Sequence, residues 1–446
     1  MLDIDKIIEG CEKQLAFLSS KGIQHAFVSI NVSITSEITL FPGSEINHAY
    51  WSRPDEEYSA IGLGKLFYLT AEGENRLNHL EQNYLQYCQQ WQAPPTAYMA
   101  FAFDAEDAMS DEWAALPNAF LCVPRLLIES KQGSNSISFN IDVNADLRSQ
   151  LDSFTSLLEE YSAYPPTKTE NDDRVVCLSD DAVNKEHWFH AAEKAIDAIR
   201  QRQFRKLVVS RRYLCEAKPS FDTRLLLSAL AERYPDCTII SYVDNASQFI
   251  AVSPERLLSL HAGQVQSDAI GGTLTEEELK QSITDDENHP VLSPKLMEEH
   301  AIIVEDICSR LEPVCQTLCL PPVPQLRKLR NIYHLETPVS GRLTSRQTVL
   351  SLTERLHPTP AIAGFPSRES VNWIRENEKH KRGWYAGAFS LMSGDQSGEV
   401  SVLLRCALVN QTRINVYAGA GLVAESDVNM EWQETELKLN AILDLL

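Results

Sequence analysis

The chain has 446 residues, 43% of them hydrophobic and 23% charged, which is enough to bury a substantial core in one large domain or several smaller ones. Its formal net charge of −22 argues against nucleic acid and anionic membranes as partners. The first residues, MLDIDKIIEGCEKQL, lack the basic start and apolar middle of a signal sequence, and no apolar run approaches the ~20 residues of a membrane span. The sequence therefore predicts a cytoplasmic globular protein that needs local positive charge wherever it binds an anion.

The first part of the chain alternates helical and strand-like patterns. Apolar residues at helical spacing predict helices over 4–18 and 72–91. Strands are predicted over 25–34, 59–69, 96–103, 118–130 and 136–143. No residue in this part suggests a particular chemistry. A polar stretch from Tyr164 to Arg174 predicts a boundary between an N-terminal half, residues 1–175, and a second segment, residues 183–446.

The second segment mixes helices and strands without a regular alternation. A helix over 188–199 precedes a strand over 206–209, and residues 238–243 and 249–253 form a hairpin-like pair. This order favours an α+β fold with antiparallel sheets over a doubly wound parallel sheet.

Two residues at strand ends are candidates for proton transfer. Lys206 opens an apolar strand, either as an edge lysine or as a general base with a lowered pKa. Glu255 follows an apolar strand in FIAVSPERLLSL, either in a surface turn with a local ion pair or as an acid with a raised pKa. The residues alone leave both alternatives open.

Carboxylates on two predicted helices are candidate metal ligands. Glu299 lies at the edge of the apolar stripe of a helix over 294–311, where a surface role is the alternative. Glu431, Glu434 and Lys438 share one face of a helix near the C-terminus. Carboxylate oxygens on two helices suit a hard cation, so the pattern favours magnesium over zinc.

Several residues are candidates for binding an anionic substrate. Arg405 lies inside a predicted apolar strand, VSVLLRCALV, where an arginine needs a partner; the alternative to a substrate carboxylate is a structural acid. A glycine turn at Gly419, Ala420 and Gly421 follows Tyr417, and the missing side chains let backbone amides approach an anion.

Two further segments predict pocket walls. Ala361 and Ile362 lie in the proline-stiffened run LHPTPAIAGFP. His334 in NIYHLETP is either a core histidine or a hydrogen-bonding group of the pocket.

Nine segments between residues 206 and 438 together resemble the chorismate-utilising enzymes and, within them, the isochorismate synthases. In order they are KLVVSR, FIAVSPERLL, AIGGTL, EEHAIIVEDI, YHLETPVSG, LHPTPAIAGFP, RGWYAGAFS, LLRCALV and YAGAGLVAESDVNMEWQETELK. The N-terminal half matches only loosely. The resemblance implies one large α+β fold of two packed, mainly antiparallel sheets flanked by helices, which residues 1–175 complete.

The resemblance also implies roles for individual residues. Lys206 matches the lysine that activates water, a position that is typically glutamine in amine-adding relatives, and Glu255 matches the acid that protonates the leaving 4-hydroxyl. Glu299 and Glu434 match the Mg²⁺ ligands, with Glu431 close to the ion. The matching substrate-binding positions are Gly272, Thr273, His334, Ala361, Ile362, Arg405, Tyr417, Gly419, Ala420, Gly421 and Lys438.

The implied activity is a Mg²⁺-dependent, reversible conversion of chorismate to isochorismate for menaquinone biosynthesis, with no obligatory protein partner. Siderophore synthesis is the alternative pathway. Salicylate synthase, aminodeoxychorismate or anthranilate synthase and a non-catalytic chorismate binder are the alternative functions. Asp268 before AIGGT and Ala388-Phe389 after WYAG depart from the family pattern, and we expect neither to touch a proposed catalytic group, so they bear on the subgroup and not on the reaction.

Overall fold

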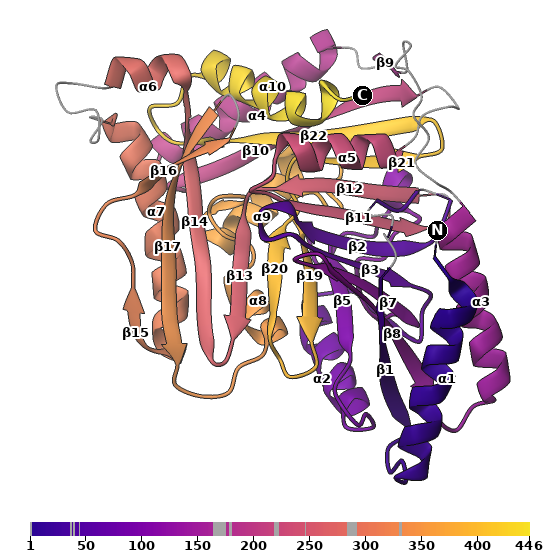
Figure 1. The fold of residues 1–446 in the computed structure, drawn as a ribbon. Coiled ribbons are helices and arrows are strands. Elements are labelled where there is room, and N and C mark those ends of the chain that lie inside the picture. Colours follow the sequence, from indigo (N-terminus) through magenta and orange to yellow (C-terminus); the bar gives the residue numbers. More distant parts are fainter. Residues whose placement is uncertain are drawn as a thin grey trace.

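The computed structural model describes residues 2–35, 38, 41–43, 45–163, 175–177, 181–217, 223–245, 247–282, 292–329 and 332–446. Its named strands form two large antiparallel sheets flanked by helices, so the expected α+β architecture is confirmed (Figure 1). The predicted boundary stretch, residues 164–174, lies outside the described residues. The division into residues 1–175 and 183–446 stays a prediction.

The larger sheet joins strands from both parts of the chain. In spatial order it contains β1 (Phe27–Ile34), β8 (Ser134–Asp142), β7 (Leu126–Lys131), β3 (Tyr58–Leu63), β2 (His48–Arg53), β11 (Thr238–Asp244), β12 (Ser247–Ser253), β21 (Cys406–Asn410), β22 (Arg413–Leu422), β10 (Lys206–Ala217) and β18 (Gly364–Phe365), with β9 (Val175–Cys177) beside β10. The N-terminal strand β2 pairs directly with β11 of the second segment.

The smaller sheet likewise joins strands from both parts of the chain. It contains β15 (Cys315–Cys319), β17 (Ile332–Leu343), β14 (Gln264–Thr275), β13 (Arg256–His261), β20 (Gly398–Val402), β19 (Ala388–Ser393), β5 (Thr96–Phe101), β6 (Ala119–Val123) and β4 (Phe67–Ala71), with β16 (Gln325–Leu329) beside β17. Here the pair of β5 with β19 joins the two parts of the chain.

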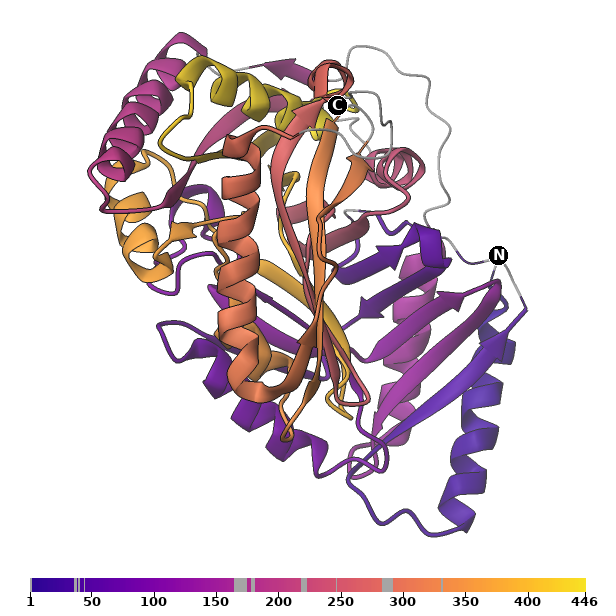
Figure 2. The same ribbon diagram turned by 90° about the vertical axis from the view of Figure 1, so that its left-hand side faces the viewer.

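The helices lie outside the sheets. They are α1 (Ile4–Ser20), α2 (Arg76–Cys88), α3 (Leu147–Ala163), α4 (Asp181–Arg200), α5 (Thr223–Arg233), α6 (Glu276–Ser282), α7 (Pro294–Leu311), α8 (Val349–Leu356), α9 (Ser367–Asn377) and α10 (Val428–Leu443), with the 3-10 helices η1 (Pro54–Glu56), η2 (Asp111–Trp113) and η3 (Glu312–Val314). Figure 2 shows α7, in orange, along one side of the smaller sheet. Within the described ranges, no helix has the length and apolar character of a membrane span.

The larger sheet is covered on both faces. One face packs against the smaller sheet through a core that includes Phe120, Phe249 and Phe389. The opposite face is covered by helices, for example through Leu15 of α1 and Phe154 of α3. Burial of each such side chain contributes about 1.5–3 kcal/mol to the stability of the fold and holds the two sheets against each other.

Short connections carry the chain from one sheet to the other, and two of them supply site residues. Pro254 and Glu255 join β12 to β13, and Leu403 to Arg405 join β20 to β21. The single strand expected around Arg405 is therefore wrong, because Arg405 has φ 45° between two strands. Predicted strands over 59–69 and 118–130 also divide between the sheets. Apolar residues are buried in both sheets, so hydrophobicity alone did not reveal these crossings.

Candidate active site

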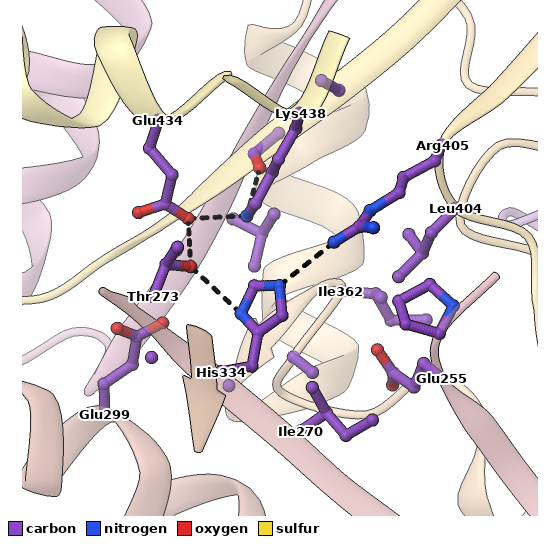
Figure 3. A pocket seen from close by; sticks show the side chains of 18 of the residues that line it. Glu255, Ile270, Thr273, Glu299, His334, Ile362, Leu404, Arg405, Glu434 and Lys438 are labelled. Carbon is purple, nitrogen blue, oxygen red and sulfur yellow. Dashed lines mark hydrogen bonds and ion pairs between the residues drawn. The ribbon is translucent and has the colours of Figure 1, made fainter. Parts of the chain in front are cut away.

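A pocket lies among β10, β14, β17, β22, α7 and α10 (Figure 3). The predicted residues that line it are Lys206, Glu255, Gly272, Thr273, Glu299, His334, Ala361, Ile362, Arg405, Tyr417, Gly419, Gly421, Glu434 and Lys438. Ala420 and Glu431 are buried but do not line it. The structure adds Val208, Pro254, Ile270, Gly271, Tyr385, Leu404 and Ala418, which the sequence did not single out.

Lys206 is buried at the start of β10. Its side chain is 1% exposed, and its Nζ lies 2.9 Å from Glu299 Oε1. β18 pairs with β10 at this position, so Lys206 does not lie on an open sheet edge. A buried ammonium needs a partner of opposite charge, and Glu299 provides it.

Glu255 is held by the connection between the sheets. Its N–H donates to Ser253 Oγ at 3.2 Å, and its carbonyl accepts from the Val402 N–H at 3.0 Å. Burial raises the pKa of the Glu255 carboxyl to about 8, with Lys206 acting in the opposite direction. The Glu255 side chain is therefore protonated at neutral pH, as a general acid must be.

Asp268 influences Glu255 through its charge. It is buried and forms an ion pair of 2.9 Å with Arg256. The negative charge of Asp268 adds to burial in raising the pKa of Glu255. Asp268 lies on β14, which pairs with β13, the strand that begins directly after Glu255, so its charge acts on Glu255 from a neighbouring strand.

A chain of hydrogen bonds crosses the pocket from α10 to Arg405 (Figure 3). Thr273 Oγ1 donates to Glu434 Oε1 at 2.9 Å and lies 3.3 Å from His334 Nδ1. His334 Nε2 lies 3.3 Å from Arg405 Nη2. Because a guanidinium only donates, we assign the His334 proton to Nδ1. Burial lowers the pKa of His334 well below its usual range, and the charge of Arg405 adds to this effect, so the ring is neutral.

Three carboxylates on α7 and α10 each have a lysine partner. Lys206 pairs with Glu299, Lys438 lies 2.6 Å from Glu434 Oε1, and Lys295 lies 2.7 Å from Glu431 Oε1. Burial raises the pKa of Glu431, and the charge of Glu434 raises it further. The carboxylates are therefore close enough to repel one another, which is a setting that favours cation binding.

The donor set fits magnesium in its chemistry. Figure 3 shows Glu299 and Glu434 on one side of the pocket and Glu255 on the other. Within the described part of the chain, no group of three or more His, Cys, Asp or Glu residues is arranged to hold a metal ion. Magnesium is commonly bound by one or two carboxylates, with water and an anionic substrate completing the shell, and Glu299 and Glu434 offer carboxylate oxygens of this kind.

The expected glycine turn is a strand. Gly419 and Gly421 lie within β22, opposite Ser210 and Val208 of β10. A Cβ on Gly421 would lie 2.6 Å from Glu299 Oε1, so the missing side chain leaves room for the carboxylate. Periodicity did not separate a turn from a strand here, because glycine is common in turns and carries no strand preference.

The backbone of Gly419 faces the pocket side of β22. Lys438 Nζ donates to the Gly419 carbonyl at 3.0 Å, and the Ser210 N–H donates to Glu378, not to Gly419. In an antiparallel ladder the N–H and C=O of one residue point the same way. The Gly419 amide is thus directed away from β10 and toward the pocket, where it can meet an anion.

Tyr385 is a pocket residue that the sequence reasoning missed. Its ring stacks on Tyr417, with centroids 5.6 Å apart and planes 17° apart. Its hydroxyl lies 2.8 Å from the position that a Cβ on Gly419 would take. Its segment, RGWYAGAFS, was among the nine that carry the resemblance, and a tyrosine inside that segment was the available clue.

Residues 12–446 match the family model described as chorismate binding enzyme. The chain is 25% identical to isochorismate synthase MenF of Bacillus subtilis, over 90% of this chain and 88% of that protein. It is 28% identical to the salicylate biosynthesis isochorismate synthase of Pseudomonas aeruginosa, over 89% of this chain and 84% of that protein.

The fold is also that of solved relatives. The structure of MenF, the menaquinone-specific isochorismate synthase from Escherichia coli, matches with a TM-score of 0.79 at 23% identity and covers 98% of this chain and 99% of that one. Anthranilate synthase component I from Streptococcus pneumoniae matches with a TM-score of 0.69 at 20% identity, covering 86% and 92% of the two chains. With the family model spanning nearly its whole length, this chain belongs to the chorismate-binding enzymes.

Proposed function

We propose that this chain is an isochorismate synthase, which converts chorismate reversibly to isochorismate. The observation that carries the proposal is a carboxylic acid, Glu255, with a pKa raised to about 8, in the same pocket as the buried amine of Lys206. One group can supply a proton and the other can accept one, which is the pair that an exchange of hydroxyl positions requires. The curated relatives named as isochorismate synthases support the same reaction.

In the proposed reaction the neutral amine of Lys206 takes a proton from water, and the water oxygen bonds to C2 of the ring. The ring double bonds move, the bond from C4 to its hydroxyl breaks, and Glu255 protonates the leaving hydroxyl, which departs as water. General-base action needs the neutral amine, so the ion pair of Lys206 with Glu299 has to open. Arg405, Tyr385 and the Gly419 amide are the donors that hold the substrate carboxylates.

Glu299 and Glu434 are the proposed ligands of a magnesium ion, with Glu431 and Lys295 behind them. When bound, the ion would contribute positive charge to the ring carboxylate and to the electron shift in the ring. Lys438 holds Glu434 Oε1 at 2.6 Å and Thr273 holds it at 2.9 Å, so the orientation of this ligand is set by the protein.

The product is proposed to enter menaquinone biosynthesis, because the E. coli relative is a menaquinone-specific isochorismate synthase. The P. aeruginosa relative is named for salicylate biosynthesis, so a pathway other than menaquinone synthesis, such as siderophore synthesis, is the second candidate. Salicylate synthase is the rival reaction in the same pocket. The Ala361-Ile362 pair, which lines the pocket, resembles isochorismate synthases more than salicylate-forming relatives.

Incubation with chorismate and Mg²⁺, followed by mass spectrometry, tests the proposal. Isochorismate is expected; salicylate with pyruvate would contradict it, and turnover only with added ammonium would indicate an amine-adding enzyme. Lys206→Ala and Glu255→Ala should each lower kcat by about 10²–10⁴-fold. Lys13→Ala and Glu9→Ala, which remove an exposed ion pair on α1, are matched controls and should leave kcat unchanged.

A further inference from the structure

The short helix η2 brings the N-terminal half of the chain to the back of the pocket. Oε1 of Glu112, on η2, accepts from the Tyr417 hydroxyl at 3.1 Å and from Arg212 Nη1 at 2.6 Å. Tyr417 and Arg212 lie directly opposite each other on β22 and β10. The Glu112 side chain is 12% exposed. A single carboxylate oxygen therefore joins a pocket-lining tyrosine to an arginine.

The backbone of η2 is fixed by contacts outside the pocket. The Glu112 carbonyl accepts from Asn410 Nδ2 at 2.7 Å. The neighbouring Trp113 is fully buried, and its Nε1 donates to the Lys381 carbonyl at 3.3 Å. The Trp113 ring also packs on the Tyr417 ring, with centroids 5.4 Å apart. These contacts make η2 a firm support for the Glu112 side chain.

The bond to Glu112 decides what Tyr417 can offer to a substrate. An ionised carboxylate only accepts, so the phenol proton of Tyr417 points at Glu112. Burial raises the pKa of Tyr417 well above its usual range, and the charge of Glu112 adds to this, so the hydroxyl keeps its proton. That one proton is then not directed at an anion in the pocket. Tyr385, stacked on Tyr417 with its hydroxyl beside Gly419, is the tyrosine left to donate.

We propose that Glu112 is a positioning residue contributed by the N-terminal half. By holding the Tyr417 hydroxyl it fixes the ring on which Tyr385 stacks, and it thereby directs the Tyr385 hydroxyl at a substrate carboxylate. Arg212 offsets the negative charge that Glu112 would otherwise bring close to a dianionic substrate. The inference rests on the proposed function only in taking chorismate as the ligand.

A double-mutant cycle on KM and kcat for chorismate consumption tests this role. Glu112→Ala is expected to raise KM about tenfold with little change in kcat, because aligned binding is lost before the chemistry is. Glu112→Gln keeps an acceptor oxygen and should retain most of the wild-type affinity. In the Tyr417→Phe background, Glu112→Ala should add nothing, because the hydroxyl through which Glu112 acts is gone. Glu106→Ala, in the same connection between β5 and β6, is the matched control and should leave KM unchanged.

Two results would overturn the proposal. An unchanged KM in Glu112→Ala would show that Glu112 does not contribute to binding, and a lower KM would show that it acts only as a negative charge that repels the substrate. If Glu112→Ala raised KM in the Tyr417→Phe background as much as in wild type, Glu112 would act through the general structure of the pocket and not through the Tyr417 hydroxyl. If Glu112→Ala does not fold, Glu112→Asp replaces it: its side chain is too short to reach the Tyr417 hydroxyl, so KM should again rise in wild type and not in the Tyr417→Phe background. A wild-type chain that binds chorismate without forming isochorismate would contradict the proposed function but not the role of Glu112. The double-mutant cycle would then be measured on the Kd of chorismate by calorimetry.

Discussion

Replacing Glu255 with glutamine should change how the stability of the protein depends on pH. The folded state keeps the Glu255 proton up to a pKa of about 8, whereas the unfolded chain releases it near 4.5. The folded pKa is raised, so the stabilisation from this group is fully present below pH 4.5 and is lost as pH rises through 8. Glutamine does not titrate, so Glu255→Gln lacks this loss.

The size of the effect follows from the two pKa values. Their difference, 8 − 4.5, is about 3.5 pH units, which at about 1.4 kcal/mol per unit sets an upper bound of about 5 kcal/mol. Between pH 5 and 8, the free energy of unfolding of Glu255→Gln should therefore rise relative to wild type by about 1.4 kcal/mol per pH unit.

Urea unfolding of both proteins across this pH range measures the difference directly, and contributions from other titrating groups cancel because both proteins share them. Glu9→Gln, at an exposed position, is the control and should show no comparable trend. A wild-type to Glu255→Gln difference that does not change with pH would refute the assignment of Glu255 as a buried, protonated acid.

Three further predictions concern the pocket. Gly421→Ala places a Cβ 2.6 Å from Glu299 Oε1, so the carboxylate has to move; kcat should fall and the Mg²⁺ affinity measured by calorimetry should weaken, and unchanged values would contradict the close packing. Arg405→Lys loses the planar fork and should raise KM for chorismate about tenfold, with a smaller change in kcat; an unchanged KM would remove Arg405 from the carboxylate site. Asp268→Asn removes a charge that raises the pKa of Glu255, so the alkaline fall in kcat, expected near pH 8 in wild type, should move to lower pH; a shift to higher pH would be the opposite of the expected sign.

The sequence predicted which residues meet in the pocket better than it predicted the elements that carry them. Arg405 was expected in a pocket because a charged residue stood in an apolar run, and the structure places it there. The strand assigned to it was wrong, because two apolar strands in different sheets are separated by only a few residues. Gly419 and Gly421 were likewise correct as pocket residues and wrong as a turn.

Other features could not be predicted, because they depend on contacts between distant segments. Glu112 belongs to the N-terminal half, in which no residue suggested a particular chemistry, and its two partners lie 100 and 305 positions away. A pattern within one segment carries no information about such a partner.

The most direct test of the central claim follows the oxygen atom. Chorismate is incubated with Mg²⁺ in water that carries the heavy oxygen isotope, and isochorismate is isolated and fragmented in a mass spectrometer. We expect one heavy oxygen in the hydroxyl at C2, because Lys206 activates solvent water for attack there and Glu255 protonates the original hydroxyl as it leaves C4. Isochorismate without the heavy isotope would show that the hydroxyl migrates within the molecule and would contradict the proposed roles of both residues.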